Sequence, residues 1–258
     1  MKSLKILTIL ILIVIFFVFL FQIKTYFYRD FLIYDNCIRT VYALVLITLT
    51  VVLNKKLNLN NFVKLRDTSP ILKSKSLFLP SIILLIYFWF NTNFENLKTI
   101  NPSGIVFLFL ATFLAASAEE FVFRFFCSNF LLNRGFKLKK TAIVTSLLFA
   151  FSHLNNIRYA NNWASPVNQV SIAFFTGLLF ISIIFITQKF WITSVLHFLI
   201  NTPNAINDLV GDSVKINVVN NFNFVSNLSS VLIVHLIFSP LIIISLFYYK
   251  RFNNYPSF

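Results

Sequence analysis

The chain has 258 residues, of which 58% are hydrophobic and only 12% charged, and its mean hydropathy is +0.80. This composition excludes an ordinary soluble domain, and repeated apolar runs of about 18 or more residues indicate a polytopic helical membrane protein. The formal charge of +14 does not indicate a nucleic-acid partner, because the Lys and Arg residues gather in short loops between apolar runs. That pattern is typical of topology determinants and of contact with the lipid bilayer.

The apolar runs predict an all-α transmembrane bundle of about eight helices. The first run, after Lys2 and Lys5, is too long for a signal peptide and lacks a small-residue cleavage site, so we expect an uncleaved helix. The expected helices span residues 6–23, 38–53, 76–90, 104–132, 141–155, 169–187, 190–206 and 229–249.

The basic residues predict the orientation of these helices. With a cytoplasmic N-terminus, inner segments hold fifteen Lys and Arg residues and outer segments hold six. This asymmetry predicts a multi-pass protein of the cell membrane with both termini cytoplasmic. We divide the chain into N-terminal membrane helices with a basic loop (1–103), a helical core (104–206), and an outer loop with the last helix (207–258).

Three charged residues interrupt the apolar run 104–132: Glu119, Glu120 and Arg124. Three ionised groups near the middle of a membrane helix would cost roughly 8 kcal/mol. Glu120 and Arg124 are four residues apart on one helical face, with the acid first, which favours an ion pair. Glu119 points about 100° away, so we expect its partner on a neighbouring helix.

Two later helices carry candidate partners. The midpoint between Glu119 and His153 falls at position 136, in the short basic turn between their helices, which predicts that the two side chains lie at equal depth and hold a water together. His197 and Asn201 share a face one turn apart, an arrangement that suits oxyanion stabilisation. Counted at 1.5 Å per residue, Glu119 lies about 27 Å and His197 about 12 Å from the cytoplasmic border. The helices that carry Glu119 and His153 must therefore protrude for this cluster to form.

The motifs Glu119-Glu120-x-x-x-Arg124, Phe149-x-x-x-His153 and His197-x-x-x-Asn201 resemble those of the CAAX-protease and bacteriocin-processing (CPBP) intramembrane endopeptidases. That family includes the type II CAAX prenyl endopeptidases and bacterial Abi proteins. The resemblance implies a protease in which Glu119 and His153 activate water. It also implies that His197 and Asn201 stabilise the oxyanion, while Glu120 and Arg124 support the site.

The sequence does not decide whether the site uses a metal ion. The family's members are often called metalloproteases, so one divalent metal such as zinc, bound by His153 and His197 with a glutamate, is one alternative. The chain lacks an H-E-x-x-H helix, and a metal-free mechanism with Glu119 as the base is equally consistent with it.

The function predicted from the sequence is hydrolysis of a peptide bond in a membrane-associated peptide or protein. Maturation of a pheromone or bacteriocin peptide and immunity to a bacteriocin are the roles we consider, while a prenylated substrate is doubtful. The alternative is a non-enzymatic immunity or scaffold protein with the same polar cluster. A proton-coupled transporter is less favoured, because we find no ionisable path outward from the cluster.

Overall fold

The computed structural model describes residues 32–59, 75–90, 92–99, 101–154, 162–187, 189–207, 228–236 and 238–240, and over these residues it contains helices and no strand. Residues 228–236 and 238–240 are helical as well. The all-helical prediction is confirmed, whereas the expected helix at 6–23 lies outside the described residues. The count of eight helices and the cytoplasmic termini stay predictions. The named elements are α2 (Leu32–Lys56), α3 (Lys75–Phe90), η2 (Phe94–Thr99), α4 (Pro102–Glu120), η3 (Phe121–Cys127), α5 (Ser128–Asn133), α6 (Leu138–Ser152), α7 (Ala164–Thr187) and α8 (Phe190–Asn207).

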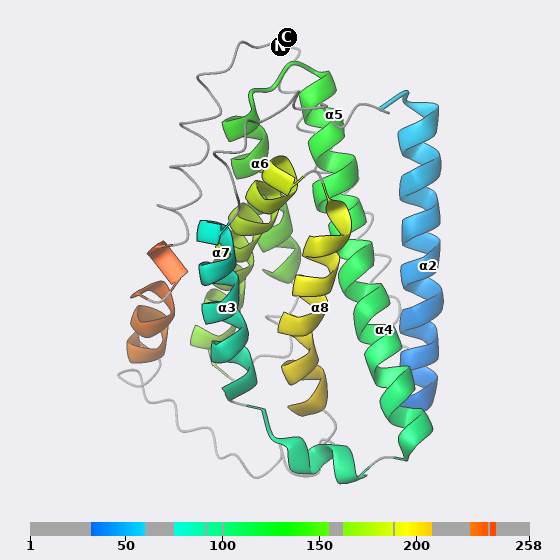
Figure 1. Ribbon diagram of the computed structural model, residues 1–258, viewed down its shortest axis with the longest axis vertical. Coiled ribbons are helices and arrows are strands. Elements are labelled where there is room, and N and C mark those ends of the chain that lie inside the picture. Colours follow the sequence, from blue (N-terminus) through cyan, green and yellow to red (C-terminus); the bar gives the residue numbers. More distant parts are fainter. Residues whose placement is uncertain are drawn as a thin grey trace.

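One long helix made of α4, η3 and α5 runs along the bundle (Figure 1). Helices α2 and α8 both pack against α4, α6 packs against α7, and α3 packs against α8. The long helix begins where the Asn101 side chain accepts a hydrogen bond of 2.7 Å from the Gly104 amide, with Pro102 in the first turn. Both features are ordinary helix-start signals, because they satisfy or remove amide donors that have no partner within the helix.

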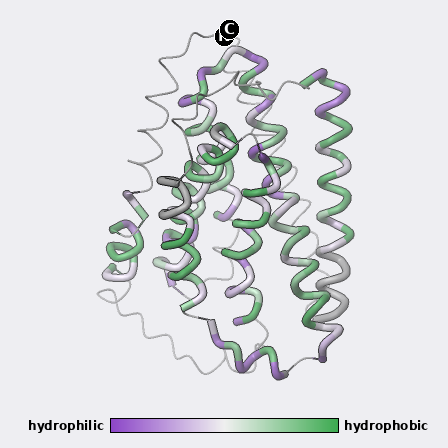
Figure 2. Tube along the Cα trace, viewed as in Figure 1, coloured by the Kyte–Doolittle hydropathy of each residue, from purple (hydrophilic) through white to green (hydrophobic). Residues whose placement is uncertain are grey.

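Two of the described helices are long and apolar enough to cross a membrane, judged by length and composition: Pro102–Asn133 with 32 residues and Ala164–Phe185 with 22 residues. Apolar residues predominate along these helices in Figure 2. Large apolar side chains also point outward from the bundle, among them Val106, which is 65% exposed, and Ile86, which is 62% exposed. Such a surface is costly in water and fits a lipid-facing bundle.

A tight turn joins α5 to α6 and makes them antiparallel neighbours, as expected. Gly135 has φ of 81° in this turn, a left-handed conformation that favours glycine, and its amide donates to the Leu132 carbonyl at 2.9 Å. In Figure 1 the long helix and this turn extend beyond the start of α8. The depths of Glu119 and His197 were counted from the ends of two different helices. Because these ends lie at different levels of the bundle, the extension accounts for the difference between the two depths.

Candidate active site

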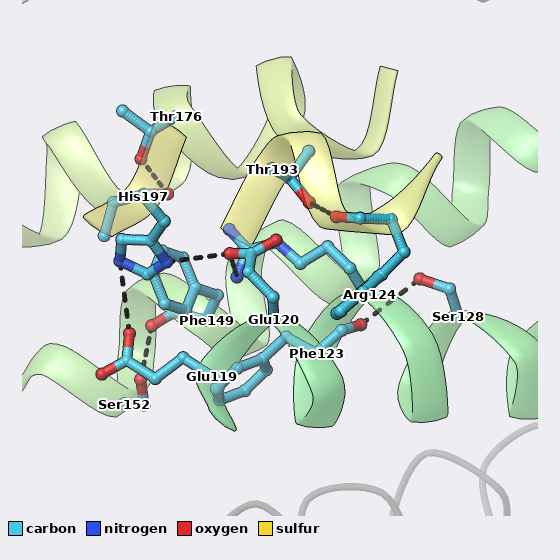
Figure 3. A network of polar contacts seen from close by, with 12 residues as sticks. Glu119, Glu120, Phe123, Arg124, Ser128, Phe149, Ser152, Thr176, Thr193 and His197 are labelled. Atoms are coloured by element: carbon cyan, nitrogen blue, oxygen red, sulfur yellow. Dashed lines mark hydrogen bonds and ion pairs between the residues drawn. The ribbon is translucent and has the colours of Figure 1, made fainter. Parts of the chain in front are cut away.

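Glu120, the last residue of α4, joins two helices through its carboxylate. The side chain is fully buried at 0% exposure. Its Oε1 accepts a hydrogen bond of 2.9 Å from His197 Nδ1 on α8 and lies 3.2 Å from Arg124 Nη1 (Figure 3). The ion pair with Arg124 is the contact expected from their spacing. The bond to His197 is an additional contact that the sequence did not suggest.

Arg124 lies in η3, a π-helical stretch that follows Glu120 directly. The wider turn is marked by Ser128, whose hydroxyl donates to the Phe123 carbonyl five residues earlier at 3.3 Å. Short π segments inside α-helices occur frequently at functional sites. Here the segment carries the one charged residue of Phe121–Cys127 into the bundle, where Arg124 is only 1% exposed.

Aromatic rings complete the surroundings of Arg124. Its guanidinium carbon lies 3.8 Å from the centre of the Phe149 ring and 5.8 Å from that of Phe180. A desolvated cation over an aromatic face gains about 2 kcal/mol. The same Phe149 ring packs edge-on against the rings of His153, at 4.8 Å, and His197, at 5.7 Å. Phe149 therefore connects the buried cation with both histidines.

His197 lies between the two glutamates. Because Glu120 is an acceptor paired with Arg124, the 2.9 Å contact places a proton on His197 Nδ1, which donates it to Glu120. On the other side of the ring, Nε2 is 3.5 Å from Glu119 Oε2, a distance for an electrostatic contact rather than a short hydrogen bond. The Glu119 side chain is 24% exposed, in contrast to Glu120.

His153 lies directly after the end of α6. Helix α6 ends at Ser152, so His153 is the residue that caps the helix, and its Nδ1 lies 2.9 Å from the Phe149 carbonyl. Within the described part of the chain, the ion-pair contact of Glu119 is with His197. The sequence predicts a helix that continues to residue 155, whereas α6 ends at Ser152.

A cavity of about 970 Å³ adjoins these residues. His153, His197 and Asn201 all line it, so the cavity joins the end of α6 to the second half of α8. Phe149 and Phe180 form part of its wall. A space of this size lies within the range of small-molecule and peptide pockets. Glu119 is not among the lining residues, but it lies 3.5 Å from His197 Nε2.

The structure describes only a few side chains that could bind a metal ion. Among the residues that the structure describes, no three His, Cys, Asp or Glu side chains are arranged to hold a metal ion. His197 Nδ1 is occupied by Glu120 and His153 Nδ1 by the Phe149 carbonyl, which leaves one ring nitrogen on each. With the Glu119 carboxylate these nitrogens make three donors, the number that a zinc site needs, but the structure does not group them around one point, so we derive no chemical step through a metal.

Two features of the site escaped the sequence reasoning. The π-helical turn has no signature in the local residues, which are simply apolar around Arg124. Phe180 on α7 belongs to no motif, and in the sequence it looks like any other core aromatic residue. Phe149, the other ring beside Arg124, is part of the same motif as His153. His235 matches no motif. Its Nε2 lies 3.2 Å from the Ser171 hydroxyl oxygen, a contact that we interpret as structural.

Comparison with known protein families gives a match to the family described as type II CAAX prenyl endopeptidase Rce1-like, over residues 101–203. Neither the curated proteins nor the solved structures contain a match to this chain. The matched segment runs from the cap of α4 into α8 and includes every residue of the candidate site. Residues 101–203 are thus similar to the Rce1-like type II CAAX prenyl endopeptidases, a family of membrane-embedded proteases.

Proposed function

We propose that this protein is an intramembrane endopeptidase that hydrolyses a peptide bond in a membrane-associated peptide or protein, with water activated by Glu119 and His153. One observation carries the proposal: His197 lies between a buried carboxylate, Glu120, and a partly exposed one, Glu119. A fixed imidazole beside a carboxylate that reaches water is a common arrangement for acid–base chemistry.

The first step is proton transfer from water to Glu119. The water oxygen attacks the carbonyl carbon of the substrate as its proton moves to the Glu119 carboxylate, which gives a tetrahedral intermediate. His153 binds and orients this water through Nε2, because its Nδ1 is already engaged with the Phe149 carbonyl. The C–N bond then breaks, and Glu119 returns the proton to the leaving amine.

The negative charge of the intermediate falls on the former carbonyl oxygen. Asn201 donates to this oxygen through its amide nitrogen, and His197 does so when its Nε2 carries a proton. Both residues line the cavity from one face of α8. Removing one such donor costs about 10²–10³ in kcat in proteases with an oxyanion hole. Glu120 and Arg124 hold the His197 ring in place and take no part in proton transfer to the substrate.

Replacement of Glu119 by Gln tests the proposal. Loss of the base should lower kcat by about 10²–10⁴ while the variant stays folded. The assay uses the full-length protein in liposomes and a panel of membrane-anchored reporter peptides, with and without an isoprenylated cysteine. Glu95→Gln is the matched control, because Glu95 is exposed and forms its ion pair with Lys98 within η2, away from the site. Full turnover by Glu119→Gln would rule out the mechanism, and failure of the wild-type protein to cleave any reporter would favour the non-enzymatic alternative.

A further inference from the structure

Exposed basic side chains gather at one end of the helical bundle. The end of α2 and the turn between α5 and α6 both lie at this end in Figure 1, and Figure 2 shows hydrophilic residues at both places. The cations there are Lys55, Lys56, Arg134, Lys137, Lys139 and Lys140, and all six are exposed. The exposed Lys98, in η2 at the opposite end, pairs instead with Glu95. Over the described residues, the two ends of the bundle therefore differ in charge.

The turn between α5 and α6 holds the densest part of this basic end. Its four cations, Arg134, Lys137, Lys139 and Lys140, lie within seven consecutive residues. None of them forms an ion pair in the part of the chain that the structure describes. Like charges this close repel one another, so the turn is a surface that an anion would stabilise.

Two of the four cations rest on aromatic rings. The guanidinium carbon of Arg134 lies 5.3 Å from the centre of the Phe130 ring, and Lys140 Nζ lies 4.8 Å from the centre of the Phe136 ring. Such contacts are weak at exposed sites, but they restrict the side chain that makes them. A side chain that is already restricted loses less entropy when it binds a ligand. The turn therefore presents ordered cations rather than freely moving ones.

Helix length places this turn at the level of the lipid headgroups. The apolar helix Pro102–Asn133 has 32 residues and ends directly before Arg134. At 1.5 Å per residue it is about 48 Å long, whereas a hydrocarbon core is about 30 Å thick, or about 40–45 Å with both headgroup layers. A helix that crosses such a bilayer carries its end into the headgroup layer. Basic segments lie by preference on the cytoplasmic side, where anionic lipids make the membrane surface negative.

We propose that the turn between α5 and α6 binds the phosphate-bearing headgroup of an anionic phospholipid in the cytoplasmic leaflet. Arg134 donates two N–H groups to the phosphate oxygens, a geometry that suits a planar guanidinium, and the three lysines supply charge. A headgroup held in the bilayer beside the turn has a far higher local concentration than free phosphate in solution. The lipid is therefore the occupant to which the inference commits.

The double variant Lys139→Gln with Lys140→Gln tests this inference. The full-length protein in a neutral detergent is titrated with a fluorescent short-chain phosphatidylglycerol, and fluorescence anisotropy gives the Kd. Each basic residue near an anionic lipid surface changes the affinity about fivefold, so the double variant should bind about thirtyfold more weakly. Both side chains are exposed, so the melting temperature without lipid should stay that of the wild type.

The double variant Lys55→Gln with Lys56→Gln is the matched control. It removes the same charge from exposed positions at the same end of the bundle, on α2 instead of the turn. Its Kd should stay within about threefold of the wild-type value. Equal weakening in the two double variants would show a general attraction of charges without a site at the turn, and would overturn the inference.

Other probes distinguish the lipid from alternative ligands. Phosphatidylcholine with the same acyl chains should bind at least tenfold more weakly than phosphatidylglycerol, because its headgroup has no net charge. Inorganic phosphate at the concentration of the lipid should not displace the fluorescent probe. Equal affinity for the two lipids, or displacement by this phosphate, would contradict the choice of an anionic lipid as occupant.

The inference goes beyond the proposed function and does not depend on it. The titrations measure lipid binding at the turn and involve no cleavage of a peptide. If the wild-type protein cleaves no reporter but the two double variants differ as expected, the lipid site stands and the proposed function fails. If the protein cleaves the reporter and the turn variant binds phosphatidylglycerol like the wild type, the lipid site fails and the proposed function stands.

Discussion

The two sides of the His197 ring differ in nearly every physical respect. On the Glu120 side, the carboxylate, Arg124 and the Phe149 ring are almost completely buried and in mutual contact. On the other side, Glu119 is 24% exposed and 3.5 Å from the ring, and the Asn201 amide faces a cavity. The difference supports the proposal that adjacent glutamates in one motif have separate tasks, one in holding the site and one in its chemistry.

The buried side should determine stability. Replacement of Arg124 by Leu leaves Glu120 buried without its cationic partner, which should lower the free energy of unfolding by about 3–5 kcal/mol. Thermal unfolding of the purified protein measures this loss. Arg134→Leu is the matched control, because Arg134 lies exposed in the turn after α5. Simultaneous removal of both charges, in Arg124→Leu with Glu120→Leu, should recover part of the loss; no recovery would contradict the assignment of the pair.

The aromatic contact should have a smaller effect on stability. Phe149→Leu removes the ring beneath the guanidinium and should cost about 1–3 kcal/mol, since both packing and the cation–π contact are lost. Activity should fall as well, because the ring also packs against His153 and His197. Phe123→Leu removes a buried ring that touches Phe149 but not the cation or the histidines. Equal loss of kcat in both variants would show that only general packing is affected.

Removal of metal ions should have the smallest effect. The proposed steps use protein groups alone, so extensive dialysis against a strong chelator should leave kcat within about twofold. Cleavage of the reporter peptide before and after dialysis, and after addition of zinc, measures this directly. Loss of activity on dialysis together with its recovery on addition of zinc would show that His153 and His197 are metal ligands in the active protein.

The sequence predicted much of the fold and the contact between Glu120 and Arg124, because both follow from local rules. Apolar run length placed the helix of Glu119 to within two residues at its start and one at its end, and four-residue spacing predicted the contact of Glu120 with Arg124. The partner of Glu119 could not be predicted in the same way. It depends on where α6 ends and on the π-helical turn, and tertiary packing decides both.

The cavity was missed for a related reason. The apolar run indicated a helix that begins at Gln169, whereas α7 begins at Ala164, so Ser165 and Asn168 were left outside the helix. Polar residues at the end of an apolar run look like loop residues in a sequence. In the structure they belong to the helix and line the cavity, where the neighbouring amides provide a polar environment within the bundle.

A direct comparison of Glu119→Gln with Glu120→Gln tests the central claim, which is that the two glutamates have separate tasks. Both variants keep side-chain size and remove one charge, and each is measured for kcat on the same reporter peptide and for thermal unfolding. Glu119→Gln should lose about 10²–10⁴ in kcat with an unchanged melting temperature. Glu120→Gln should melt at a lower temperature, since it removes a buried charge pair. Equal loss of stability in both variants, or full activity in Glu119→Gln, would contradict the account.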